Sequence, residues 1–455
     1  MTQSISKSLL QEYSKLMHDH WTFLFEPWPQ IPKSKYHRTE VKNVNDIEHV
    51  KEIVLQRLGH IPVFFFLTVL FAVQDYPGPY RNSEKGLLIL YQLLKNCSME
   101  QMGRFIPRSS FYDIYRVFYN KQVQILDKKL SGYLASMFST IQIRVLLAQQ
   151  NSSMFKHITL LLDGHDTRVN QIGIEAEKMY SYKFKKSGLR TQVCIDNNGM
   201  VLFMSRSAPC AENTDGVMLT KMKLEKHIHK LDCVGLDGGY TQHLNKMVES
   251  SDLNLGNFCH PIRKAKGVNL TNDEAKFNKL FGSYRSRIES TFGELGSTFQ
   301  RFNNQAVIRT CDNESFNLQL KLGSLLLNVK KFTDLGKIQT QPHHLLWTQA
   351  EFDYCDDKAE IVIESPSLKD QMQYANDISS CQRKLLDLDM GEDQPMEEDN
   401  VYEVDMILEN RKKGRQTEYL VKWKGYPDTT WETLDKFNDT ECIDDYWEKV
   451  NNNQL

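Results

Sequence analysis

The chain has 455 residues, which is too long for one ordinary domain and predicts about two to four folded units with sizeable cores. Its formal net charge of −2 excludes a general attraction to nucleic acid, so any DNA contact must come from local groups of basic residues. The 9 cysteines include no C-x-x-C pair, and the strongest apolar run, Ile61–Val73, is too short to span a bilayer, so we expect a soluble, intracellular protein with reduced thiols and no membrane partner.

The N-terminal part of the chain is predicted to hold an arm and then a helical domain. Residues 1–57 are polar and aromatic and include FEPWPQIPKS, which is typical of a loosely ordered or docking arm. Residues 58–150 have helical periodicity, with Ser98 and Ser109 as expected N-caps on either side of a short turn. This pattern is a candidate helix-turn-helix, in which Arg108 and Ser109 would contact DNA, and the alternative is an ordinary helical bundle.

Three acidic residues in the next predicted domain, residues 151–335, occupy positions suited to a hard metal ion. Asp163 follows the apolar run Ile158–Leu162, a predicted buried strand, and Asp237 follows a second apolar stretch before a Gly-Gly turn. Ligands of open α/β sheets collect at the carboxyl ends of strands. Glu289 lies beside the apolar stripe of a long predicted helix. If the three converge, they suit two-metal phosphodiester chemistry, and the alternative is that each is a turn former, a cap or a solvated residue.

Two basic segments are candidates for contact with DNA phosphates. KMYSYKFKKSGLR alternates aromatic and basic residues, which predicts a half-buried strand with a cationic face, and PIRKAKG precedes the long helix. The alternative for the first segment is a solvated strand face. The candidate DNA-binding residues of the two segments are Lys183, Lys185, Lys186, Arg190, Lys264 and Lys266.

The region from Asp163 onward resembles the DDE superfamily of transposase endonucleases, in particular its PIF/Harbinger-like branch. The stretches that carry the resemblance are LLLDGHDTRV, LRTQVCIDNNGMVLFMSRSAPCAENTDG, GLDGGY and YRSRIESTFGELGSTFQRF. The resemblance implies a ribonuclease H-like core in which Asp163, Asp237 and Glu289 are the catalytic, metal-binding residues. Where many relatives have Thr after the first Asp-Gly pair, this chain has His165 and Asp166.

The same resemblance implies the cofactors and the partners. The cofactors would be two Mg²⁺ or Mn²⁺ ions, and the substrates would be the DNA ends of a transposable element and a target DNA. A homo-oligomer and an accessory DNA-binding protein are further expected partners.

Residues 336–400 end in the acidic run LDLDMGEDQPMEED, which is typical of a flexible linker. Residues 401–450 predict three short strands and a terminal helix. Through YEVDMIL, EYLVKWKGYP and TWE they resemble a chromodomain, whose methyl-lysine cage would be Tyr402, Trp423 and Tyr426. Such rings hold a methylated ammonium by cation-π attraction, and the histone tail would add as a strand.

The sequence therefore predicts a multi-domain α/β protein. It comprises a helical N-terminal region with a candidate helix-turn-helix, a ribonuclease H-like catalytic core, an acidic linker, and a chromodomain of a small β-sheet plus a helix. The predicted function is that of a DDE transposase in the nucleus, directed to methylated chromatin. Two alternatives remain open: a domesticated, catalytically silent DNA- and chromatin-binding adaptor, and a host nuclease without strand transfer.

Overall fold

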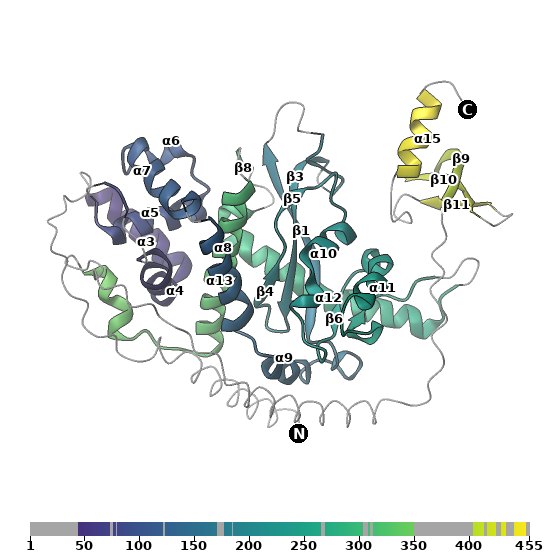
Figure 1. Cartoon of the computed structure of the whole chain (residues 1–455), viewed down its shortest axis with the longest axis horizontal. Coiled ribbons are helices and arrows are strands. Elements are labelled where there is room, and N and C mark those ends of the chain that lie inside the picture. Colours follow the sequence, from purple (N-terminus) through teal and green to yellow (C-terminus); the bar gives the residue numbers. More distant parts are fainter. Residues whose placement is uncertain are drawn as a thin grey trace. The chain divides into compact units, whose positions relative to one another are not determined.

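The computed structural model of the chain divides into two compact units. The structure describes residues 44–72, 76–78, 80–121, 123–170, 177–183, 185–264, 269–303, 308–309, 313–349, 404–413, 416–424, 429–433 and 441–451. One unit is Met1–Pro261 with Asn278–Gly391, and the other is Ile262–Phe277 with Glu392–Leu455. Residues 1–43 of the predicted arm and most of the predicted linker lie outside the described residues. The prediction of a loosely ordered arm as far as residue 57 is wrong at its end, because residues 44–57 belong to the helix Val44–Leu58, several of whose apolar side chains are buried. The helical region and the central sheet thus form one unit (Figure 1).

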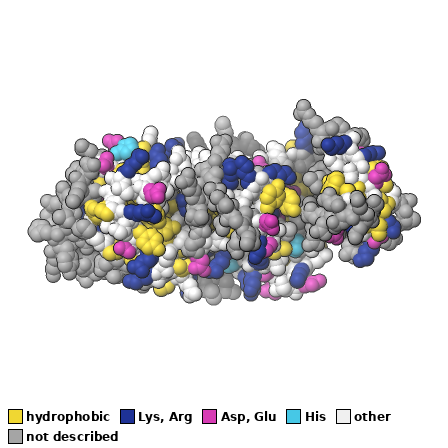
Figure 2. All heavy atoms as spheres, turned by 90° about the horizontal axis from the view of Figure 1, so that it is seen from above, with side chains coloured by type: hydrophobic (Ala, Val, Ile, Leu, Met, Phe, Trp, Pro, Cys, Tyr) yellow, Lys and Arg dark blue, Asp and Glu magenta, His cyan; other side chains and the backbone are white. Residues whose placement is uncertain are grey.

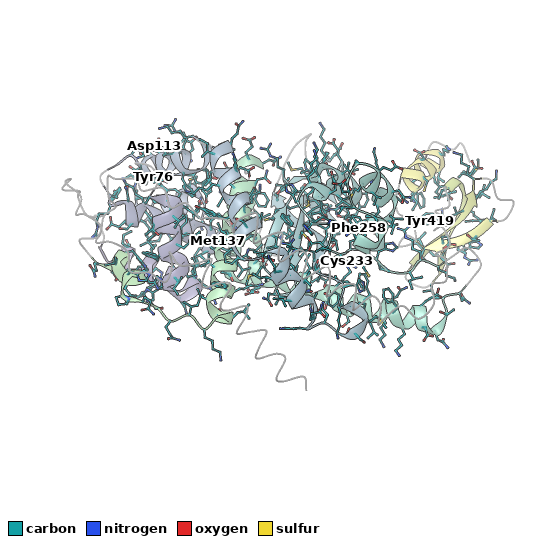
Figure 3. All side chains as sticks on the ribbon, turned by 60° about the horizontal axis from the view of Figure 1, so that its bottom comes forward. Tyr76, Asp113, Met137, Cys233, Phe258 and Tyr419 are labelled. Carbon is teal, nitrogen blue, oxygen red and sulfur yellow. The ribbon has the colours of Figure 1, made fainter. Side chains whose placement is uncertain are left out.

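The helical region is built from apolar helices that share an aromatic core. Its helices are α3 (Val44–Leu58), α4 (His60–Phe65), α5 (Asn82–Lys95), α6 (Met99–Met102), α7 (Arg108–Tyr115), α8 (Val123–Met137) and α9 (Ile141–Ala148). The strongest apolar run of the sequence forms α4 and the π-helix Phe66–Phe71, and almost all of its described side chains are buried, which confirms the predicted core helix. Phe71 stacks on Tyr76 (Figure 3) with ring centroids 3.9 Å apart.

The two expected helix caps of this region have different outcomes. Ser98 is the N-cap of α6, because its hydroxyl accepts from the backbone N–H of Gln101. The prediction for Ser109 is wrong, since α7 begins at Arg108 directly after the extended residue Pro107. α6 ends at Met102 and has only one turn, so the first helix of the candidate helix-turn-helix is shorter than expected.

The central sheet is mixed, as expected for a ribonuclease H-like core. Its strands are β1 (Leu160–Asn170), β2 (Tyr180–Ser181), β3 (Lys186–Asp196), β4 (Val201–Met204), β5 (Ala208–Pro209), β6 (Val234–Gly235), β7 (Phe258–Cys259) and β8 (Ile308–Arg309). β3 pairs antiparallel with β4 on one side and with β1 on the other, and β6 and β7 then follow β1 in parallel. Cys233, just before β6, and Phe258 lie close together within this core (Figure 3).

Helices cover both faces of the sheet. α12 (Asn272–Thr298) covers the face of Gly235, against which Phe281 packs. The predicted apolar stripe of this helix is largely buried, which confirms the helical periodicity. α10 (Asp215–Met222) and α11 (Thr241–Glu249) cover the opposite face, where Gly164 points toward Asp215.

α13 (Asn313–Leu335) joins the helical region to the sheet. It packs against α8 and α4 on one side and against β4 on the other. The amide of Asn328 accepts from the backbone N–H of Val201 at 2.9 Å and donates to the Val201 carbonyl at 2.7 Å. The start of the predicted linker is also folded, because the short helix Pro342–Thr348 packs on α4 through His344 and Phe64.

Among the described residues, no single helix has the length and apolar character to cross a membrane, although two sharply bent helix pairs reach that length and composition when each pair is taken together.

The C-terminal unit contains the three strands and the terminal helix that the sequence predicts. Its elements are β9 (Val404–Lys413), β10 (Gln416–Trp423), β11 (Thr429–Thr433) and α15 (Glu441–Asn451). The antiparallel order is β11-β10-β9, so β9 has a free edge among the described strands. Its small core is formed by Ile407, Tyr419, Val421, Ile443 and Tyr446, of which Figure 3 marks Tyr419.

A buried acidic residue lies at the turn between β3 and β4. Asp196 is fully buried, and its Oδ1 accepts from the backbone N–H groups of Asn198 and Met200, both at 2.9 Å. Its Oδ2 has no hydrogen-bond partner among the described residues. Burial raises the pKa of Asp196 to about 6, because these hydrogen bonds only partly offset the loss of water.

We expect Asp196→Asn to stabilise the fold at neutral pH. The folded state holds the proton more tightly than the unfolded chain, so the wild type loses stability as pH rises from about 4 to 6, and the full penalty applies above that range. The variant removes the buried charge, so its free energy of unfolding should exceed that of the wild type by about 1 to 3 kcal/mol at pH 7.5. Thermal unfolding at several pH values measures this difference.

The gain should shrink as pH falls from about 6 and vanish below the ordinary pKa of 3.8, where the carboxyl is protonated in both the folded and the unfolded state. Asp334→Asn is the matched control, because this exposed carboxylate pairs with Lys330 on its own helix. A pH-independent difference at Asp196 would show that its charge is not the cause.

Candidate active site

Two of the predicted acids lie side by side because of the register between β1 and β6. Leu160 is opposite Val234 and Leu161 is opposite Gly235 in this parallel pair. Continuing that register places Asp163 opposite Asp237, just beyond the last paired residue of β6. The two carboxylates therefore meet at the edge of the sheet where the parallel pairing ends.

The predicted position of Asp163 at the end of a strand is only partly correct. β1 does not end at Leu162 but continues to Asn170, paired with β3. The second half of β1 is polar, and it stays in the sheet because its buried polar side chains find partners there. Asp166, for example, is opposite Arg190 and forms an ion pair with it. Asp163 thus lies just beyond the residues of β1 that pair with β6, while its own strand continues.

Arg285 of α12 bridges the two aspartates. Its Nη2 is 3.4 Å from Asp163 Oδ2, and its Nη1 is 3.2 Å from Asp237 Oδ1. Burial raises the pKa of Asp163, the Arg285 guanidinium and the N–H of Gly164 lower it, and the charges of Asp215 and Asp237 raise it again. A single guanidinium therefore offsets part of the negative charge of this edge.

Asp237 also caps a short helix, which is one of the alternative roles that the sequence suggests for this residue. Its Oδ1 accepts from the backbone N–H of Gly238 at 2.7 Å, at the start of the one-turn helix Gly238–Tyr240. The side chain is nevertheless 56% exposed, compared with 23% for Asp163. Capping holds the carboxylate in place without removing it from solvent.

Glu289 lies on α12 one turn after Arg285. The neighbouring residues of this stripe contact β1 in order: Arg285 reaches Asp163, and Phe292 packs on His165 with ring centroids 4.6 Å apart. The Glu289 side chain itself is exposed. The structure therefore brings Asp163 and Asp237 together and places Glu289 on the adjacent helix stripe, outside their direct contacts.

Two residues of this site are missing from the sequence-based prediction. Arg285 precedes Glu289 by one helical turn, a spacing that puts both on one face and that the sequence displays. Asp215, the first residue of α10, accepts from Gln192 at 2.9 Å and has a pKa that burial raises. No sequence signal identifies Asp215, because its proximity depends on how α10 packs on the sheet.

The residues suit a hard divalent cation in donor type. Carboxylate oxygens are the ligands that Mg²⁺ and Mn²⁺ prefer, and the two aspartates already hold one cationic group, that of Arg285, between them. Within the described ranges, no group of three acidic, His or Cys side chains is arranged to hold a metal ion. Asp163 and Asp237 are therefore two carboxylates at this edge that could hold such an ion.

The first basic segment forms a hairpin turn instead of the predicted half-buried strand. β2 contains only Tyr180 and Ser181, and the chain then turns back into β3 at Lys186. Tyr182 is 52% exposed, and the ammonium of Lys185 lies 5.8 Å from its ring centroid. The prediction of one strand from Tyr180 to Lys185 is wrong, because the strand ends at Ser181. Tyr182, Lys183 and Lys185 lie in a turn, where Lys185 has a left-handed φ of 54° that does not fit a strand.

The candidate DNA-binding residues differ in exposure. Lys183, Lys185 and Lys186 are exposed, and so are Arg108, Ser109 and Lys264. Lys266 lies outside the described residues. On the face drawn in Figure 2, Lys and Arg side chains form separate groups among acidic and hydrophobic side chains, rather than one continuous basic surface.

Arg190 is not available for phosphate contact in this structure. Its side chain is only 16% exposed, and its Nε and Nη2 donate to Asp166 at 2.7 and 3.0 Å. The Nη1 of Arg190 also lies 3.5 Å from Asp215. We therefore assign Arg190 to the internal network that holds β1, β3 and α10 together.

The predicted methyl-lysine cage lies largely outside the described residues. Tyr402 and Tyr426 belong to the undescribed part, and of Trp423 only the backbone is described, at the end of β10 opposite Val404. The guanidinium of Arg411 lies over the Trp431 ring, 4.0 Å from its centroid. Trp431 itself is partly exposed in β11.

Comparison with known proteins gives matches for both units. Residues 162–317 match the family model of the DDE superfamily endonuclease, and residues 402–449 match that of the Chromo (CHRromatin Organisation MOdifier) domain. Searches of curated proteins and of solved structures gave no match. Asp163, Asp237 and Glu289 all lie within the first matched range, and β9, β10, β11 and most of α15 lie within the second. The chain thus carries a DDE superfamily endonuclease domain followed by a chromodomain.

Proposed function

We propose that the chain is a nuclear DNA transposase that cuts and joins DNA with two divalent metal ions and is directed to methylated chromatin. The observation that carries the proposal is the register that places Asp163 opposite Asp237 within a DDE endonuclease domain. Asp163 and Asp237, which share the guanidinium of Arg285, offer the carboxylate oxygens that hard divalent ions prefer. The chromodomain supplies the link to chromatin.

Asp163, Asp237 and Glu289 would hold the ions. When bound, two Mg²⁺ or Mn²⁺ ions stabilise the charge on the attacking and leaving oxygens of a phosphodiester. Water attacks the phosphorus at the element end, the P–O3′ bond breaks, and a 3′ hydroxyl is released. That hydroxyl then attacks a phosphorus of the target strand, and one P–O bond of the target breaks as the new one forms.

The exposed hairpin is the best candidate on the core for DNA contact. Lys183, Lys185 and Lys186 project from the turn, and Tyr180 packs edge-on against Tyr182 with ring centroids 5.3 Å apart. Charged and aromatic groups in one place suit a phosphate backbone with accessible bases. The start of α7, with its exposed Arg108 and Ser109, is a second proposed contact, for the element ends.

The chromodomain is proposed to bind a methylated histone tail. Since β9 is an edge strand among the described strands, a peptide can add to it by backbone hydrogen bonds. Tyr402, Trp423 and Tyr426 would surround the methylated ammonium by cation-π attraction. A tail bound there would keep the endonuclease near methylated nucleosomes.

Asp237→Asn should abolish metal-dependent cleavage while leaving DNA binding intact. Loss of a charged ligand removes several kcal/mol of transition-state stabilisation, so we expect cleavage of a labelled DNA duplex in Mn²⁺ to slow by at least about 100-fold. Asp252→Asn is the matched control, because this aspartate is exposed and lies elsewhere on the core. Equal cleavage by the Asp237 variant and the wild type would refute the site assignment.

Replacing Lys183, Lys185 and Lys186 by Gln should weaken DNA binding in a salt-dependent way. Each lost phosphate contact should reduce the slope of log affinity against log salt concentration by about 0.9 for a duplex. Fluorescence anisotropy at several salt concentrations measures the slope. Lys226→Gln, a change of another exposed lysine of the core, is the control, and an unchanged slope in the triple variant would exclude the hairpin from the DNA interface.

Trp423→Ala should remove the preference for methylated lysine. The lost cation-π contact predicts about a tenfold fall in affinity for a trimethyl-lysine histone peptide, with little change for the unmodified peptide. Isothermal titration with both peptides measures the ratio, and far-ultraviolet circular dichroism checks that the small sheet is folded. A wild-type protein that binds both peptides equally would contradict the cage.

A further inference from the structure

The ion pairs of Arg285 are looser than the ion pair between Arg190 and Asp166. Arg285 lies 3.4 and 3.2 Å from Asp163 and Asp237, whereas Arg190 donates to Asp166 at 2.7 and 3.0 Å. Charge-assisted N–H···O bonds are usually about 2.7 to 2.9 Å long. Arg285 thus contacts both carboxylates but forms a short bidentate hydrogen bond with neither.

The guanidinium occupies the space that a shared metal ion would need. Asp163 Oδ1 accepts from the N–H of Gly164 at 2.8 Å, so the oxygen that faces Arg285 is Oδ2. On Asp237, Oδ1 receives both the Gly238 N–H and the Arg285 Nη1. A cation that binds Asp163 Oδ2 and Asp237 together must therefore replace the guanidinium.

Arg285 is held in a way that permits this replacement. Its Nε has no hydrogen-bond partner among the described residues, so the polar contacts of the side chain that we find are the two ion pairs. One of those partners, Asp237, is more than half exposed, which weakens that pair by solvent screening. The backbone of α12, by contrast, is fixed by the buried side chains of Tyr284 and Ile288.

We propose that Arg285 is an internal counter-cation that keeps Asp163 and Asp237 together in the metal-free protein and competes with the divalent ions for them. The inference rests on the proposed function, since it concerns the same two carboxylates. Metal binding then requires Arg285 to leave both aspartates. The released guanidinium stays at the edge of the site, where a DNA phosphate is the anion that can accept it, so DNA and metal favour each other's binding.

The test measures metal affinity of the full chain without DNA and without turnover. Arg285→Gln removes the competing charge and should raise the affinity for Mn²⁺ by at least about tenfold in isothermal titration. Arg285→Lys keeps the charge and should stay close to the wild type. Arg287→Gln is the control on the same helix, because Arg287 stacks on Tyr284 and donates to Asn151 without contacting either aspartate.

A second measurement uses stability, so that an unfolded variant cannot be mistaken for a positive result. Without its counter-cation, Arg285→Gln should melt at a lower temperature than the wild type in a chelator, and Mn²⁺ should raise its melting temperature by more than that of the wild type. Combining Arg285→Gln with Asp163→Asn should abolish this gain. An Mn²⁺ affinity for Arg285→Gln equal to or below that of the wild type would overturn the proposal.

A DNA titration tests the coupling. A short DNA duplex should increase the Mn²⁺ affinity of the wild type and have a smaller effect on Arg285→Gln, and an equal increase in both proteins would exclude a transfer of Arg285 to phosphate. The outcomes distinguish failure of this inference from failure of the proposed function. If Arg285→Gln does not raise Mn²⁺ affinity while Asp237→Asn still abolishes cleavage, only the competition by Arg285 is refuted. If Asp163→Asn leaves Mn²⁺ binding unchanged, both the competition and the proposed metal site are refuted.

Discussion

The parallel register between β1 and β6 is the constraint on which the candidate active site depends. A buried polar network just before the two strands fixes it: Arg144 pairs with Asp232 at 2.8 and 2.7 Å, and Thr159 donates to Asp232 at 2.8 Å. Thr159 also exchanges hydrogen bonds with the backbone of Cys233. Removal of one partner of such a network leaves a buried charge unpaired, so slippage of the register is strongly disfavoured. Asp163 and Asp237 face each other as a consequence.

Two carboxylates that cannot separate need positive charge between them, and this requirement links the fold to the chemistry. In the metal-free chain Arg285 supplies it from α12, whose position is set by Tyr284 and Ile288 in the core. The same requirement suits the site to divalent ions, which bring more charge in a smaller volume. The nearby Asp215 adds a further negative charge, so a single guanidinium does not neutralise the site. The site can therefore be stable without metal and still attract it.

The features that the sequence predicts correctly are those with local causes. The apolar run before Asp163, the glycines after Asp237 and the apolar stripe of α12 depend on neighbouring residues, and each lies in the expected element. The prediction is wrong where contacts between residues far apart in the sequence determine the local structure. The polar half of β1 remains a strand because Asp166 finds Arg190, and Asp215 joins the site through the packing of α10. Neither contact has a signature in the spacing of the sequence.

The pairing of an endonuclease domain with a chromodomain can be related to how charge is distributed along the chain. The chain as a whole has a net charge of −2, and on the face drawn in Figure 2 the Lys and Arg side chains lie in separate groups, so attraction to DNA is local and salt-sensitive. If the chromodomain binds a histone tail as proposed, it would raise the effective concentration of nearby DNA for the endonuclease domain of the same chain. The edge strand β9 offers such a contact through backbone groups. Under the proposed function, specificity for chromatin would reside in this small sheet, and the endonuclease domain would act on nearby DNA.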